Sequence, residues 1–488
     1  MSRTSDSLPL PPPLIVAAAL AGAVAVGCAM VLSVRLGLAS AAALCYVPLA
    51  LLNLRMAIVV WLPSVGLIAV TALDVGPNLA GMVILVSWFG AMASHRSGLR
   101  ALIQENAGVL LPLGGLVVWL MLSMAWAEHS PVGSEVFFGW LVAGVIVLVI
   151  STVITDRRYL RLAVAALVLG AVVSVGLGLF GGAIQPPSAG SSDATGRIVG
   201  GSGDPNFLAA GVVPAIVLAA GLAAGSTRVA VWVAAGVATA LLTVGLVASE
   251  SRGGFVAALL AAVVMLVLAK RHRAWAVAFL LCVTGIAAAW FSTDPAAWER
   301  LSDFNESNGR SELWGVAVQM WQDNPVAGVG LQAFVDNADG YVRELGSLEF
   351  AEFLTEQPKV VHNTYLELLA ETGLVGLILF VAVIAGTLRA AWRAAALFEL
   401  IGDRAMATLA KSVIAATAAM LASTAFVSGG IDRRFWVLVA FGPALLATAR
   451  LQAAGGEQAD RFVHPRRRSA RRRVRAPIPA TARTAVES

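Results

Sequence analysis

The chain has 488 residues, of which 58% are hydrophobic and 13% are charged, and its mean hydropathy is +0.82. Soluble domains average roughly 25% charged residues, so this composition excludes a soluble globular protein. The formal net charge is +5, but acidic and basic residues are concentrated in different segments of the chain.

Apolar runs of about 17–23 residues recur from Leu14 to Arg450, and each is long enough to cross a hydrocarbon core of ~30 Å as a helix. The runs contain Gly and Pro and lack the alternation of apolar and polar residues that a membrane β-barrel requires. The sequence therefore predicts an all-α, polytopic membrane protein with about 12–14 transmembrane helices. The three cysteines lie in apolar runs without paired spacing, which indicates neither a disulfide nor a zinc site.

Lys and Arg in short loops mark the cytoplasmic side of a membrane protein, and the loops of this chain alternate by that rule. Residues 1–13 are predicted to be a cytoplasmic N-terminus, followed by a first span that lacks a cleavage signal and is retained. Transmembrane helices are expected over residues 14–291 and 363–450. Residues 292–362 then form one large extracytoplasmic loop.

This loop and the C-terminal tail differ in charge. From Ser292 to Val361 there are twelve Asp or Glu against four Arg or Lys, whereas Arg450 to Ser488 contains ten Arg against three acids. Residues 451–488 are predicted to be a cytoplasmic tail that enforces topology beside anionic membrane lipids, which attract each such charge by about 1 kcal/mol. Nucleic-acid binding is not expected for a tail tethered at a membrane.

The large loop is predicted to contain a short amphipathic helix. Leu313, Ala317, Met320 and Trp321 fall on one helical face before a stop at Asp323-Asn324-Pro325. Tryptophan favours the membrane interface. We therefore expect this helix to lie along the membrane surface.

Four polar stretches lie at predicted extracytoplasmic boundaries of the membrane, where ionisable residues would meet a ligand arriving at headgroup level. In chain order they are Arg197 with Asp204-Pro205-Asn206; Ser249-Glu250-Ser251-Arg252-Gly253; Gly309-Arg310 with Glu312 and Trp314; and His362-Asn363-Thr364-Tyr365 with Glu367 and Glu371.

Each stretch also has a purely structural explanation. Arg252 is then an arginine at a helix end, Arg310 balances a nearby glutamate, His362 forms hydrogen bonds at a helix start, and Asp204 and Asn206 cap a helix. The turn from Gly328 to Gly330 lacks the Lys and Ser or Thr of a phosphate-binding loop, so we assign it a structural role.

Taken together, the four stretches indicate an anionic ligand. A guanidinium presents a planar fork to phosphate oxygens, so Arg252 and Arg310 can bind a diphosphate. His362, the one histidine of the loop, can accept a proton from a hydroxyl nucleophile. This combination suits glycosyl transfer from a lipid diphosphate. No Asp-x-Asp pair occurs in the outer loops, so we expect arginines in place of a metal, and no cofactor.

The ordered set of motifs resembles the O-antigen ligase and polymerase superfamily over about residues 190–395. The residues that carry the resemblance are Asp204-Pro205-Asn206, Ser249-Glu250-Ser251-Arg252-Gly253, Gly309-Arg310 with Trp314, Asn324-Pro325 with Gly328-Val329-Gly330 and Phe334, and His362-Asn363-Thr364-Tyr365-Leu366 with Glu371-Thr372-Gly373.

The resemblance implies a metal-independent enzyme that takes a polysaccharide from undecaprenyl diphosphate at the outer face of the bacterial inner membrane. It implies that Arg252 and Arg310 bind the diphosphate and that His362 acts on the acceptor hydroxyl. Further substrate-binding residues are expected to be Arg197, Asp204, Asn206, Asn363, Tyr365 and Glu371. The Arg-rich tail and the large number of spans depart from the roughly twelve spans usual in the family.

Two activities share these motifs and differ in their acceptor. A ligase transfers the glycan to lipid A core or another envelope acceptor, whereas a polymerase joins lipid-linked repeat units. The single large loop with its His-Asn pair favours the ligase. A transporter or flippase is disfavoured, because such proteins place ionisable groups near the middle of the bilayer, often in repeated halves.

Overall fold

The computed structural model describes residues 33–67, 75–93, 104–127, 133–180, 197–268, 273–293, 310–345 and 360–463, with five single positions before residue 33 and two after residue 293. Every regular element in this part of the chain is helical, and it contains no strand. The predictions for the N-terminus, residues 1–13, and for the chain beyond residue 463 lie outside the described residues.

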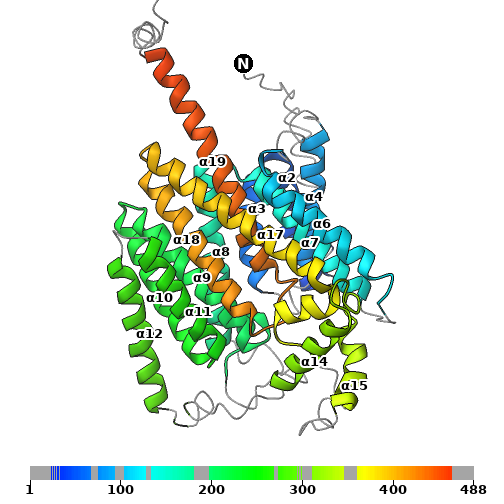
Figure 1. Cartoon of the computed structure of the whole chain (residues 1–488). Helices are drawn as coiled ribbons and strands as arrows, with labels where there is room; N and C mark the ends of the chain where they lie inside the picture. The colour runs from blue at the N-terminus through cyan, green and yellow to red at the C-terminus, as the bar shows by residue number, and fades with distance from the viewer. Residues whose placement is uncertain are drawn as a thin grey trace, which may run out of the picture.

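Seven helices in the described segments are long and apolar enough to cross a membrane, and six apolar helices of 10–17 residues accompany them. The chain is therefore a multi-pass, all-α membrane protein, as predicted (Figure 1). The main elements are α2 (Val34–Leu52), α3 (Leu54–Trp61), η1 (Leu62–Gly66), α4 (Val75–Ala93), α6 (Ala107–Ser123), α7 (Gly133–Val153), α8 (Arg157–Phe180), η4 (Gly200–Ser202), α9 (Pro205–Ala224), α10 (Val229–Ala248), α11 (Arg252–Leu268), α12 (Arg273–Thr293), α14 (Arg310–Asp323), α15 (Phe334–Leu345), α17 (Thr364–Leu400), α18 (Arg404–Thr424) and α19 (Arg433–Val463).

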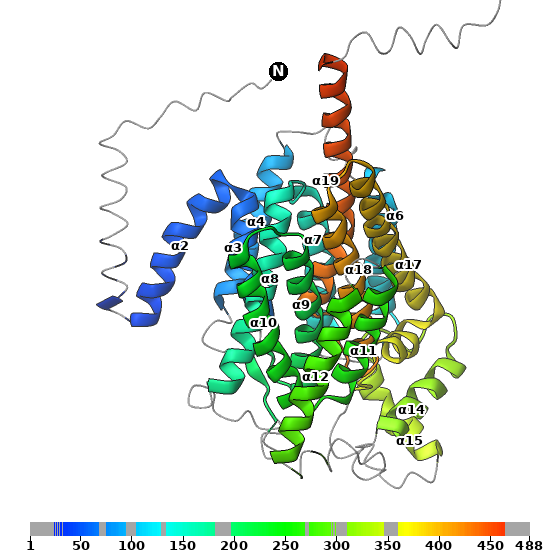
Figure 2. The ribbon, with the colours of Figure 1, turned by 90° about the vertical axis from the view of Figure 1, so that its left-hand side faces the viewer.

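The centre of the bundle is formed by α9, α17, α18 and α19, around which the other helices pack. Small residues let α9 and α18 approach closely, as where Gly221 meets Ser412. Larger aromatic side chains fill the space between α17 and α19, where the rings of Phe380 and Phe435 stack with centroids 5.7 Å apart. By contrast, α2 stands at the edge of the bundle and contacts α3 and α4 (Figure 2).

Two contacts join helix ends on the side that is predicted to carry basic loops. At one end, Arg157 Nε lies 3.3 Å from Asp403 Oδ2, and Arg450 Nη1 donates to the carbonyl of Glu105 over 3.2 Å. The loop helices α14 and α15 lie at the other end (Figure 1). We call these the basic end and the loop end. The helix α19 continues to Val463, so residues 451–463 of the predicted tail are helical.

The amphipathic helix predicted in the large loop is confirmed as α14. Its apolar face, with Leu313, Ala317 and Met320, is buried in a small protein core together with Phe334 and Val361. That face is therefore covered by protein, whereas a helix lying on the membrane surface would offer it to lipid. The expected interfacial position is not supported for this reason.

The sequence did not reveal α15, which lies in the stretch described above only as part of an acidic loop. Its residues Phe334 and Val342 are buried against α14 and α17, while Asp336 and Asp339 occupy other faces. Val335, Ala338 and Tyr341 pack on the same side as these two buried residues, so α15 presents one apolar face to the small core. This spacing of apolar residues was present in the sequence and was not used.

A break at Gly373 divides α17 into a short first part, residues 364–372, and the apolar part that can cross a membrane, residues 374–400. Gly373 has φ of 63°, a value that favours glycine. The carbonyls freed by the break accept hydrogen bonds from Val329 N–H (2.9 Å, Ala370), Gly330 N–H (2.8 Å, Glu371) and the Trp119 indole (2.9 Å, Thr372). The turn around Gly328–Gly330 thus has the structural role assigned to it from the sequence.

Candidate functional site

Hydrogen bonds join the first two polar stretches at the loop end. Arg197 Nε donates to the backbone carbonyl of Ser249 over 2.9 Å, and its Nη2 lies 3.5 Å from Asn206 Oδ1. The same Asn206 oxygen accepts a hydrogen bond from Ser251 Oγ at 2.8 Å. Arg197 and Asn206 therefore hold the turn that ends at Arg252, the first residue of α11.

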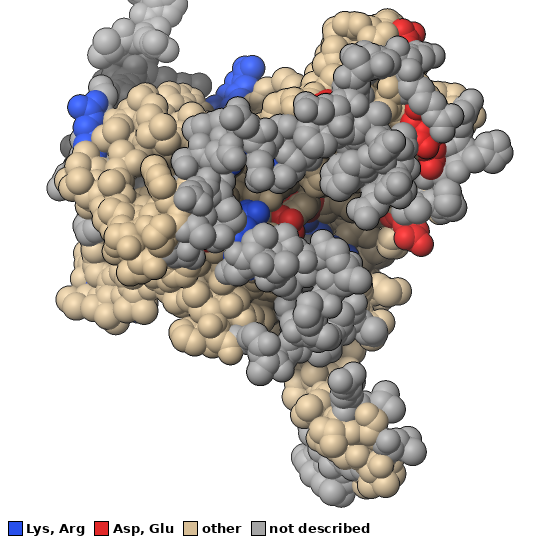
Figure 3. All heavy atoms as spheres, turned by 90° about the horizontal axis from the view of Figure 1, so that it is seen from below, with Lys and Arg blue, Asp and Glu red and all other residues tan. Residues whose placement is uncertain are grey.

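Arg310 joins this group from the large loop, as the first residue of α14. Burial lowers the pKa of its guanidinium, the Asp204 carboxylate raises it, and the Arg252 guanidinium lowers it again. The three charged groups therefore lie within electrostatic reach of one another. Seen from this end, basic and acidic atoms lie side by side in a hollow near the middle of the face (Figure 3).

Asp204 also performs the capping role considered from the sequence. Its carboxylate accepts hydrogen bonds from the backbone N–H groups of Asn206 at 2.7 Å and Phe207 at 3.0 Å, and so begins α9. The cap fixes one carboxylate oxygen on the helix. Its negative charge offsets part of the repulsion between the two nearby arginines.

His362 is positioned by the segment between α18 and α19. Its backbone has φ of 55°, uncommon for a residue other than glycine, and its N–H donates to Ser428 Oγ over 3.0 Å. Next to it, Thr364 N–H and Oγ1 donate to the Val427 carbonyl over 3.1 and 2.8 Å, and Thr364 Oγ1 accepts from Gly429 N–H. The start of α17 is thus fixed to this segment.

The same segment reaches the arginine cluster. The backbone of Gly253 lies so close to Phe426 that an added Cβ would come within 2.9 Å of the ring, and one on Gly429 would lie 3.8 Å from Phe207. From the other side, the Trp314 indole on α14 donates to the Val361 carbonyl over 3.1 Å. All four predicted polar stretches therefore meet at the loop end, through a segment whose importance the sequence did not reveal.

Three of the residues expected to bind substrate are occupied with holding α17. Asn363 caps this helix by accepting from Tyr365 N–H at 3.0 Å. The Tyr365 hydroxyl donates to the Leu421 carbonyl over 2.6 Å. Glu371 is 5% exposed, and its carboxyl accepts from the backbone N–H groups of Gln332 and Phe334 at the start of α15. These contacts favour a positioning role over direct contact with substrate.

Glu367 belongs to the site, although it was quoted only as part of a motif and not predicted to bind substrate. It lies on the first part of α17, before the Gly373 break, and its carboxylate accepts a hydrogen bond from Ser428. Burial raises its pKa to about 7, with the Ser428 hydrogen bond acting in the opposite direction. Burial and the charge of Glu367 also raise the pKa of Glu371. Ser428 thus connects the backbone of His362 to a carboxyl group that titrates near neutral pH.

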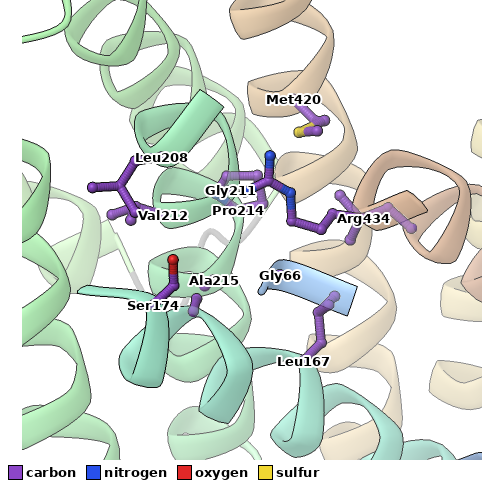
Figure 4. Close-up of a pocket in the computed structure, with 12 residues that line it drawn as sticks. Gly66, Leu167, Ser174, Leu208, Gly211, Val212, Pro214, Ala215, Met420 and Arg434 are labelled. Carbon is purple, nitrogen blue, oxygen red and sulfur yellow. The ribbon is translucent and has the colours of Figure 1, made fainter. Parts of the chain in front are cut away.

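A buried ion pair supports the site from the bundle side. Arg434 on α19 donates from Nη2 to Asp432 Oδ2 over 2.6 Å and from Nη1 to Ser202 Oγ over 3.0 Å. Its side chain points towards Gly211 and Pro214 of α9 and lines a cavity of about 20 Å³ (Figure 4). This volume suits about one water molecule. The pair therefore serves to join α19 to the turn before Asp204, and leaves no room for a lipid diphosphate.

The family model described as O-antigen ligase matches residues 237–381. The chain thus carries a domain of the O-antigen ligase and polymerase superfamily. No curated protein matches the chain. The resemblance first drawn from the ordered motifs is confirmed over less than a third of the 488 residues.

The matched O-antigen ligase segment contains Arg252, Arg310 and His362. Arg197, Asp204 and Asn206 precede it, and Ser428 follows it. Hydrogen bonds connect Arg197, Asn206 and Ser428 to the matched segment, and Asp204 acts on Arg310 through its charge. The candidate site therefore extends beyond the recognised domain on both sides.

Proposed function

We propose that the protein is a metal-independent O-antigen ligase-type glycosyltransferase. It transfers a polysaccharide from undecaprenyl diphosphate to an acceptor hydroxyl, in lipid A core or another envelope acceptor, at the outer face of the inner membrane. The observation that carries this proposal is the meeting of Arg252 and Arg310 at the loop end, inside the segment that matches the O-antigen ligase family.

The Arg252 guanidinium lowers the pKa of Arg310, so the two cations repel, and a ligand of negative charge bound between them would attract both. A diphosphate offers oxygens to both planar guanidinium forks. Because its charge grows as the bond between the anomeric carbon and phosphate oxygen breaks, Arg252 and Arg310 stabilise the transition state more than the ground state.

His362 then acts on the acceptor. Its imidazole takes the proton of the acceptor hydroxyl while the oxygen of that hydroxyl attacks the anomeric carbon. The diphosphate leaves with the electron pair of the broken bond. Ser428 fixes the His362 backbone, Arg197 and Asn206 fix the turn that carries Arg252, and Asp204 caps α9 beside it, so these residues contribute through preorganisation.

The decisive experiment is transfer by purified His362→Ala and Arg310→Ala variants with an undecaprenyl-diphosphate glycan as donor. Both should lose activity while remaining folded. Arg228→Ala, an exposed arginine at the basic end, is the matched control and should remain active. Normal transfer by both variants would contradict the catalytic assignment, as would loss of activity in EDTA that Mg²⁺ restores.

The glycan profile of a null mutant separates ligase from polymerase. Long lipid-linked polymer with unmodified acceptor is the expected ligase result, whereas accumulated single repeat units would show a polymerase.

The placement of the site has its own test, which uses a Ser311→Cys variant in which the three native cysteines are replaced. Ser311 is exposed on α14. An impermeant thiol reagent should label it from outside the cell. Labelling from the cytoplasm only would overturn the topology.

A further inference from the structure

A large cavity with no role in the proposed reaction lies at the basic end, opposite the candidate active site. Its volume is about 980 Å³, and it is enclosed by the loop between α9 and α10, the end of α11, and the hairpin formed by α17 and α18. Figure 1 shows this hairpin at the same end as α9, α10 and α11 and above them. The volume falls at the upper end of the range of about 300–1,000 Å³ usual for ligand sites.

The polar part of the cavity carries a net positive charge. Arg404 and Lys411 both line it from α18, and at 1.5 Å per residue they lie about 10 Å apart along one helical face. Lys411 Nζ is 2.6 Å from Glu399 Oε1, so this pair is neutral overall. No ion pair of Arg404 is found among the described residues. Since Lys411 and Glu399 neutralise one another, the positive charge of Arg404 gives the cavity its net positive charge.

The other walls are apolar and open towards the surroundings of the bundle. Trp392 is 58% exposed and Val267 is 65% exposed, and Leu268, Ala395 and Ala396 continue the same lining. A ligand that fits both parts must combine an anionic head with a hydrocarbon chain. The hydroxyl-bearing residues Ser226 and Thr227 complete the polar rim.

We propose that this cavity binds an anionic phospholipid. Arg404 and Lys411 bind the headgroup phosphate, and Trp392 and Val267 contact the acyl chains. The leaflet that faces the basic loops of a membrane protein is the anionic one, and basic pockets between helices on that side bind lipid headgroups. This site is separate from the transfer reaction and does not depend on the proposed function.

The test is lipid binding by the purified full-length protein, measured by native mass spectrometry. Phosphatidylglycerol is compared with phosphatidylcholine of the same acyl chains, and inorganic phosphate is a third arm. Phosphatidylglycerol should bind more tightly. Arg404→Gln and Lys411→Gln should each weaken this binding about fivefold, the equivalent of one charge near a membrane surface.

Two further variants make the result independent of misfolding. Glu399→Gln removes the negative partner of Lys411 and should strengthen phosphatidylglycerol binding about fivefold. Arg393→Gln, an exposed arginine next to Trp392 that does not line the cavity, should leave it unchanged. Equal binding of both lipids, or equal effects of Arg404→Gln and Arg393→Gln, would overturn the proposal. Competition by inorganic phosphate at equal concentration would show a phosphate site and also overturn it.

Discussion

The buried ion pair between Asp432 and Arg434 allows a quantitative test of how the site is supported. The pair is buried in the bundle, with exposed fractions of 6% and 8%. Asp432→Asn leaves the Arg434 cation without a carboxylate partner, because an amide oxygen and Ser202 Oγ can accept hydrogen bonds but carry no negative charge. Breaking a buried pair by removing one partner costs about 3–5 kcal/mol of unfolding free energy. Arg434→Met should cost about as much, because it leaves the Asp432 carboxylate buried and unpaired.

The double variant, with Asn at 432 and Met at 434, buries no charge. Its unfolding free energy should lie within about 1 kcal/mol of the wild-type value, since replacing both partners of a buried pair is often neutral. The assay is reversible unfolding in mixed micelles of detergent and SDS, followed by circular dichroism, for all four proteins. The losses of unfolding free energy in the two single variants should thus sum to several kcal/mol more than the loss in the double variant. Additive losses in the double variant would refute the reasoning, and so would a single variant that costs less than about 1 kcal/mol.

Three further predictions concern His362, Glu367 and the break in α17. Ser428→Ala removes the hydrogen bonds of its hydroxyl to Glu367 and to the His362 backbone, and loss of the latter, worth about 1 kcal/mol, should lower transfer about fivefold with the protein still folded. The exposed Ser311→Ala is the control, and equal activity of the two variants would exclude positioning through Ser428. Because burial raises the pKa of Glu367 to about 7, from its ordinary value of 4.5, its contribution to stability is greatest below that ordinary value and is lost as pH rises through about 7. Glu367→Gln should therefore lessen the fall in melting temperature over this pH window, and an unchanged slope would contradict the shift. Gly373→Ala places a Cβ against the Val326 carbonyl at a positive φ and should lower the unfolding free energy by about 1–3 kcal/mol. Gly340→Ala in α15, with open space around it, is the control and should not destabilise the protein. Similar melting temperatures of the two variants would show that the break tolerates a side chain.

The sequence by itself determined the class of the protein and the motifs of the site. Apolar runs of spanning length predict helices because lipid offers no partner for free backbone groups. The face of α14 was predictable for a similar reason, since Leu313, Ala317 and Met320 recur at helical spacing. Arg252, Arg310 and His362 were chosen because a guanidinium fork suits phosphate oxygens and an imidazole can accept a proton from a hydroxyl.

Only the tertiary structure decided which of the chosen residues bind other protein groups. Asn363, Tyr365 and Glu371 were expected to meet substrate, but they hold α17 through a cap, a hydroxyl and a buried carboxyl. The identity of a polar residue in a motif does not show whether its side chain binds a ligand or a backbone amide far along the chain.

The tertiary structure also revealed partners that no local pattern could show. Ser428 donates to Glu367 and holds His362, and Ser202 meets Arg434, although these residues are far apart in the chain. Hydrogen bonds act over about 3 Å of space, whereas a sequence motif records only neighbours along the backbone. The sequence therefore determined which residues could carry charge and protons at the membrane surface, and the packing of α9, α11, α17 and α18 decided which of them meet.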